Sequence, residues 1–172
     1  MAALDNYFER KSAAIAERQR DWTVSPEKAV ATVKAQSKVA GITGARPIQM
    51  GDYTIITDSG PGLAGHTLGP TSPELLLGAL ASCLVHTYLI QATLQKIPLD
   101  DVQINISGTL DYKSVVGMSV DQIPAIRDIE YEAKVESPAP AETIAKLHEI
   151  VEVSCPVLNT LRHPTNIRRV ME

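Results

Sequence analysis

The fold is decided by residues 73–96, PELLLGALASCLVHTYLIQATLQK, the richest apolar stretch of the chain. No Asp, Glu, Lys or Arg lies between Glu74 and Lys96, and Pro98 stands two positions beyond the stretch. These features predict a single helix, about 36 Å long at 1.5 Å per residue, that ends before Pro98. Because the helix is apolar on nearly every side, we expect strands or a second subunit to surround it completely.

Shorter elements are predicted on both sides of this helix. Upstream, the patterns indicate an amphipathic helix at 2–20 and a strand at 28–41. A turn or glycine loop at 41–46, a second strand at 53–57 and a long loop at 58–73 follow. Downstream, they indicate an antiparallel pair of strands at 102–110 and 126–135, with one face exposed to solvent. Helices at 141–153 and 156–162 and a closing strand at 165–171 follow. Strands occur in groups between the helices, so the α+β class is favoured over a parallel sheet.

Composition excludes several classes of function. The 172 residues carry 16 Lys and Arg against 20 Asp and Glu, a net charge of −4, which disfavours binding of nucleic acid. Two cysteines are too few for a secreted disulfide scaffold, and the first twenty residues hold no apolar run of a signal peptide. We therefore expect a cytoplasmic protein. Polar and small residues interrupt the long apolar stretch, so we expect a buried helix and no membrane span.

The two cysteines are the first candidates for chemistry. Cys83 lies in the middle of the long helix, and Cys155 lies before Pro156, on the face that continues the apolar positions of the preceding helix. Buried cysteines often pack simply as small hydrophobes, and that interpretation stays open. A reactive thiol needs an activator: for Cys155 the dipole of a helix starting at Pro156, and for Cys83 a cation such as Arg46 on the glycine loop.

Two further side chains are candidates, each with a structural alternative. Glu74 suits an ion pair with Arg46, or else is a first-turn glutamate favoured by the helix dipole. It lies nine residues before Cys83, about 13 Å along a regular helix and on its opposite side, so direct contact with the sulfur is excluded. His86 shares the face of Cys83, which leaves open a Cys/His acyl-transfer pair or an ordinary core histidine. Combining both with Cys155 and His163 gives no usual zinc spacing.

Two segments, GPTSPELLLGALASCLVHT at 69–87 and SCPVLNTL at 154–161, resemble the OsmC/Ohr family, the osmotically inducible protein C and organic hydroperoxide resistance proteins. The similarity extends from about residue 40 to the end. It implies the OsmC-like fold, in which antiparallel sheets wrap a long buried central helix within an intertwined homodimer. On this basis we expect an OsmC-like domain at 26–172, with residues 1–25 as an N-terminal helical extension.

The resemblance also implies a cysteine-based peroxidase that reduces organic hydroperoxides to alcohols. Cys83 would attack the peroxide and become a sulfenic acid, and Cys155 would resolve it as a Cys83–Cys155 disulfide. Arg46 would stabilise the thiolate, and Glu74 would hold Arg46. No metal, haem or flavin is implied, and an external dithiol of the lipoyl type would regenerate the thiols. The alternatives are a noncatalytic module of the same fold that binds an apolar ligand, and the Cys/His acyl-transfer enzyme.

Overall fold

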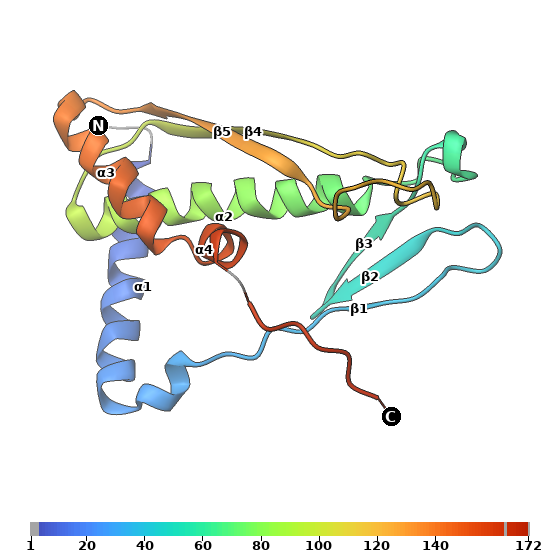
Figure 1. Ribbon diagram of the computed structural model, residues 1–172. Helices are drawn as coiled ribbons and strands as arrows, with labels where there is room; N and C mark the ends of the chain where they lie inside the picture. The colour runs from blue at the N-terminus through green and yellow to red at the C-terminus, as the bar shows by residue number, and fades with distance from the viewer. Residues whose placement is uncertain (1–3, 164, 172) are drawn as a thin grey trace. The chain divides into compact units, whose positions relative to one another are not determined.

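The computed structural model describes residues 4–163 and 165–171 and confirms the α+β class (Figure 1). The α-helices are α1 (Asp5–Val24), α2 (Ser72–Gln95), α3 (Ala141–Ser154) and α4 (Pro156–Arg162). The strands are β1 (Gln36–Ser37), β2 (Arg46–Met50), β3 (Tyr53–Thr57), β4 (Asp101–Thr109) and β5 (Arg127–Glu136). They form two separate antiparallel sheets, β1-β2-β3 and β4-β5. The chain divides into two compact units, residues 17–78 and residues 1–16 with 79–172, and each is described by itself.

The larger unit is built on the hairpin of β4 and β5, which runs beside α2 (Figure 1). Exposed and half-buried residues alternate along both strands, which confirms the predicted pair with one wet face. Val102 pairs with Val135 and Ile106 with Tyr131, so the half-buried positions of the two strands share one face. That face packs against the core of the unit.

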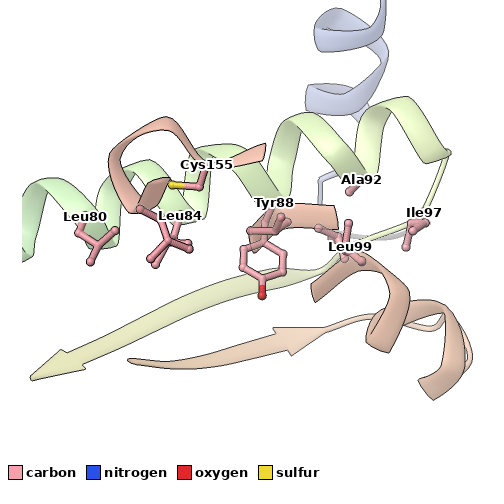
Figure 2. Packing of buried hydrophobic residues seen from close by; sticks show 10 residues of the cluster. Leu80, Leu84, Tyr88, Ala92, Ile97, Leu99 and Cys155 are labelled. Carbon is pink, nitrogen blue, oxygen red and sulfur yellow. The ribbon is translucent and has the colours of Figure 1, made fainter. Parts of the chain in front are cut away.

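The helix α2 buries one face only. Leu80, Leu84, Tyr88 and Ala92 recur every four residues, which places them on one side of the helix, and all are buried (Figure 2). They form a core with residues of α3, α4 and the chain after α2: Ile97, Leu99, Leu147, Val151, Cys155 and Leu158. Leu94 remains 42% exposed, so this chain alone does not surround the helix on every side, and the expected cover by a second subunit stays a prediction.

By length and composition α2 is long and apolar enough to cross a membrane, contrary to the expectation that its apolar run is too short. Core helices of soluble proteins pass the same test. The contacts of α2 with α3 and α4 in the core identify it as the central helix of this unit.

The N-terminal helix forms as expected, although it extends four residues further. It ends at Val24, directly before the predicted break at Ser25 and Pro26. None of its residues is buried, but Leu4 and Phe8 at its start pack against the core of the larger unit. The helix is therefore exposed along most of its length and attached at its beginning.

The smaller unit departs most from the sequence predictions. The strand expected over residues 28–41 is reduced to Gln36–Ser37. Val30 and Val33 remain exposed, so the alternating apolar side chains of this segment do not form a buried face. Arg46 belongs to β2, an unpredicted strand that pairs with the whole of the predicted β3, and not to the glycine loop before it.

The closing strand expected at 165–171, in the larger unit, is also wrong, since those residues form neither strand nor helix.

The long loop predicted at 58–73 is present and is organised by one carboxylate. Asp58 is buried and accepts backbone N–H bonds from Ser59, His66 and Leu68. These bonds hold the pKa of Asp58 below its usual range. The Asp58 carboxylate thus fixes the conformation of the loop that follows β3 by binding backbone N–H groups of the loop.

Candidate active site

The larger unit brings the two cysteines together. Cys83 lies on α2 and is partly buried, while Cys155 lies between α3 and α4 and is completely buried. Cys155 belongs to the buried core cluster and Cys83 packs against that cluster, although 72 residues of sequence separate them. Figure 2 shows the Cys155 side chain beside Leu84 of α2, which confirms that this cysteine faces the core.

A break in the helix positions Cys155. The helix α3 ends at Ser154, and α4 begins at Pro156, as the sequence predicts. Pro156 has no N–H and so cannot continue the hydrogen-bond ladder of α3. The next backbone N–H, that of Val157, influences the Cys83 thiol and lowers its pKa. The expected activation of Cys155 by the start of this helix stays a prediction.

The groups around Cys83 have opposite effects on the pKa of its thiol. Burial is the largest influence and raises the pKa of the Cys83 thiol, and the neighbouring Cys155 raises it further. The Val157 N–H and the Thr87 hydroxyl act in the opposite direction and lower the pKa of Cys83, and the Thr87 hydroxyl donates to the backbone carbonyl of Cys83 at 2.8 Å. The net effect raises the pKa of Cys83, so these neighbours alone keep it a thiol at neutral pH.

Arg46 and Glu74 both lie in the smaller unit, and each is engaged locally. The Arg46 guanidinium donates to the carbonyl of Gly44 at 3.0 Å. Glu74 accepts from the backbone N–H and the hydroxyl of Thr71, both at 2.7 Å, and these bonds lower the pKa of Glu74. No ion pair joins Arg46 and Glu74 within the described ranges 4–163 and 165–171. The predicted role of Arg46 beside a thiolate stays a prediction.

The contact of Glu74 with Thr71 is a capping box. A Thr directly before a helix and a Glu three residues later satisfy two unpaired N–H groups at the helix start. Thr71 stands in that position before α2, and its hydroxyl also accepts the Glu74 N–H at 3.4 Å. The structural alternative for Glu74, a first-turn glutamate, is therefore what the chain forms.

His86 is directed at the N-terminal helix. The Lys11 amino group lies 3.1 Å from Nε2 of His86, and burial together with this charge lowers the pKa of His86. This contact pairs one ring nitrogen of His86 with Lys11, and the Cys/His pair of Cys83 and His86 stays a prediction. In the part of the chain that the structure describes, no three His, Cys, Asp or Glu side chains are grouped as metal ligands.

A polar cluster at the helix break was missed by the sequence reasoning. The side-chain amide of Asn159 donates to three backbone carbonyls, those of Glu152 and Val153 at 3.2 Å and that of Cys155 at 2.8 Å. The Glu152 carboxylate accepts from Arg162 and from the hydroxyl of Tyr131, both at 2.9 Å. Burial and this carboxylate raise the pKa of Tyr131 to about 12. The sequence signal was Pro156, whose missing N–H leaves a carbonyl of α3 without its helical partner.

Comparison with protein families gives one match, the OsmC-like protein family, over residues 65–169. The match covers more than half of the chain, and it begins later than the resemblance near residue 40 suggested. None of the curated proteins compared with the chain matches it.

Solved structures share the fold at low sequence identity. An OsmC-like protein from Mycoplasma pneumoniae is 20% identical with a TM-score of 0.66, over 77% of this chain and 88% of that one. A putative osmotic stress induced and detoxification response protein from Psychrobacter arcticus is 15% identical with a TM-score of 0.61, over 78% and 91%. An organic hydroperoxide resistance protein OsmC from Legionella pneumophila is 18% identical with a TM-score of 0.55, over 77% and 90%. These likenesses show the OsmC-like fold.

Proposed function

Because the chain belongs to the OsmC-like protein family, we propose that it is a thiol-dependent peroxidase that reduces organic hydroperoxides. One observation carries the proposal: two cysteines from distant parts of the sequence meet at one core, with Cys155 inside it and Cys83 packed against it. The name of the Legionella pneumophila relative, an organic hydroperoxide resistance protein, points to the substrate class.

The proposed cycle has three steps. The Cys83 thiolate attacks the O–O bond of ROOH and takes one oxygen, giving a sulfenic acid and an alkoxide that is protonated to ROH. The Cys155 thiol then attacks the sulfenic sulfur, forming a disulfide and releasing water. A dithiol reductant exchanges with the disulfide and leaves as its own cyclic disulfide, which restores both thiols. The net reaction converts ROOH and a dithiol into ROH, water and an oxidised dithiol.

The order of the two sulfurs follows from their exposure and donors. Cys155 is completely buried, whereas Cys83 is partly exposed and has two neighbours, the Val157 N–H and the Thr87 hydroxyl, that lower its pKa. We therefore assign the first attack to Cys83. Since burial raises the pKa of Cys83, the thiolate requires a cation as well, and we propose that Arg46 supplies it. Glu74 has its own role at the start of α2 and is left out of this proposal.

The proposal extends to partners and compartment. We propose a homodimer, because α2 and β3 expose large apolar side chains, among them Leu94, Tyr53 and Ile56. Sedimentation velocity gives the test, with a mass of two chains expected against the 18.6 kDa of one. An external dithiol of the lipoyl type, no bound cofactor and a reducing cytoplasm complete the proposal.

Peroxide turnover tests the function. Wild type, Cys83→Ser and Cys155→Ser are assayed with cumene hydroperoxide and a dithiol, with Ser82→Ala as a matched control on the exposed neighbour of Cys83. Cys83→Ser should abolish consumption of peroxide, Cys155→Ser should stop at a trapped sulfenic acid, and Ser82→Ala should match wild type. Wild-type protein that consumes no peroxide, with both thiols still free afterwards, would favour the noncatalytic alternative and refute the proposal.

A further inference from the structure

A groove of about 880 Å³ lies between α1 and the end of α2, within the larger unit. Small and apolar residues form part of its wall on the side of α2, namely Ala92, Ile97 and Pro98. Four of its lining residues on the side of α1 are Asn6, Glu9, Ala13 and Ala16.

These four residues of α1 begin a regular pattern along the helix. Steps of three and four residues alternate from one to the next, and the same steps continue to Arg20 and Thr23. This is the spacing of the a and d positions in a coiled coil, and it places all six side chains on one face, which we call the α1 seam. No residue of α1 is buried, and Glu9 and Arg20 form no ion pair with the residues that the structure describes.

We propose that the α1 seam binds the α1 seam of a second copy of the chain, with the two helices antiparallel. In this orientation each a position of one helix faces a d position of the other. When Ala13 faces the partner's Ala16, Glu9 faces the partner's Arg20, because the members of each pair lie at equal distances from the middle of the seam. The two-fold symmetry of such a contact repeats every pair.

Charge distinguishes the antiparallel from the parallel orientation. Two parallel helices in register would oppose Glu9 to Glu9 and Arg20 to Arg20, and like charges repel. In the antiparallel pair, both charged positions of the seam meet the opposite charge. Beside the seam, Arg10 and the partner's Glu17 lie opposite each other in the same way. The surface that complements the seam is therefore the seam itself, which identifies a second copy as its occupant.

Side-chain size supports the same arrangement. Ala13 and Ala16 stand in the middle of the seam, and small side chains allow two helices to approach closely. The second helix would enter the groove beside Ile97 and Pro98 and remove their apolar surface from water. The groove and the seam contain none of the three residues named above for the homodimer, so this contact is a separate surface.

A disulfide trap tests the register of the two helices. The double variant Glu9→Cys/Arg20→Cys is made in the full chain, oxidised with diamide and run on a denaturing, non-reducing gel. The two positions are 11 residues apart on one helix, or about 16 Å, which is too far for a disulfide within one chain. We expect a covalent dimer that dithiothreitol separates. Tyr7→Cys/Arg18→Cys is the matched control, because it has the same spacing on the opposite face of α1, and it should run as a single chain, like wild type.

Charge reversal tests the complementarity. Glu9→Arg alone and Arg20→Glu alone each place like charges in the contact, and each should weaken association at least about tenfold in sedimentation equilibrium. The combined variant Glu9→Arg/Arg20→Glu restores opposite charges and should recover most of the wild-type affinity. A merely structural effect of either substitution would not be reversed by the other.

Equal yields of covalent dimer from the two cysteine pairs would overturn the proposal, and so would association that neither charge reversal weakens. If circular dichroism shows that a single reversal does not fold, the cysteine pairs decide alone. A chain that is inactive toward peroxide would refute the proposed function and leave both measurements unchanged.

Discussion

Oxidation of the two cysteines should stabilise the protein by an amount that the structure allows to be calculated. The Cys83–Cys155 disulfide would close a loop of 72 residues that contains β4, β5 and α3. In the chain-entropy model, a loop of this size stabilises the folded state by about 4 kcal/mol. Both cysteines pack in the same core cluster of the larger unit, and any strain in the disulfide would reduce this stabilisation.

The assay is thermal melting of reduced and oxidised protein. For a chain of this size, about 1 kcal/mol changes the melting temperature by 2–4 °C, so the oxidised form should melt about 10 °C higher. Protein reduced with dithiothreitol is compared with protein treated with one equivalent of cumene hydroperoxide. Thiol titration of each sample establishes how many cysteines are free.

Cys155→Ser is the control, because peroxide can oxidise its Cys83 but cannot close the loop. Its melting temperature should therefore lack the rise of the wild type. The reasoning is refuted if oxidised wild type has no free thiols and yet melts at or below the temperature of the reduced protein. It is refuted equally if both thiols remain titratable after treatment.

Three further predictions concern single side chains. Leu84→Ala, at a position with 0% exposure, should lower the free energy of unfolding by about 2–5 kcal/mol in urea denaturation at unchanged m-value. Lys11→Met removes a positive charge that disfavours the imidazolium of His86, so the pKa of His86 measured by NMR titration should rise toward 6.5; an unchanged pKa would contradict the contact. Arg46→Met should slow reaction with peroxide at least about a hundredfold and move its pH profile upward, with partial recovery in Arg46→Lys; an unchanged profile would exclude Arg46 as the activating cation.

The larger unit was predictable because its sequence patterns agree with its packing. The helices at 73–96, 141–153 and 156–162 and the strand pair all have a buried face, and the spacing of their apolar residues follows that face. The alternation at 28–41 and the segment at 165–171 have no such face, so local pattern alone misled the prediction. The strand β2 was missed because its partner β3, and not its own composition, makes it a strand.

The sequence predicted which residues belong to the site but not which contacts they make. The sequence context of the cysteines indicated both sulfurs, and the capping box of Thr71 and Glu74 could be read directly from the sequence. The three contacts of Asn159 depend on the course of the backbone after Pro156, which no spacing rule contains. The activation of Cys155 by the dipole of α4 stays a prediction.

The effects of burial, neighbouring donors and a cation on the reactivity of Cys83 can be compared. Burial raises the pKa of Cys83 by more than the neighbouring Val157 N–H and Thr87 hydroxyl lower it. A cation brought within about 4 Å contributes about 4 kcal/mol at an effective dielectric constant of 20, which is enough to reverse the balance. Loss of Arg46 should therefore slow the reaction with peroxide and move its pH profile upward. An unchanged rate would mean that a group other than Arg46 activates Cys83.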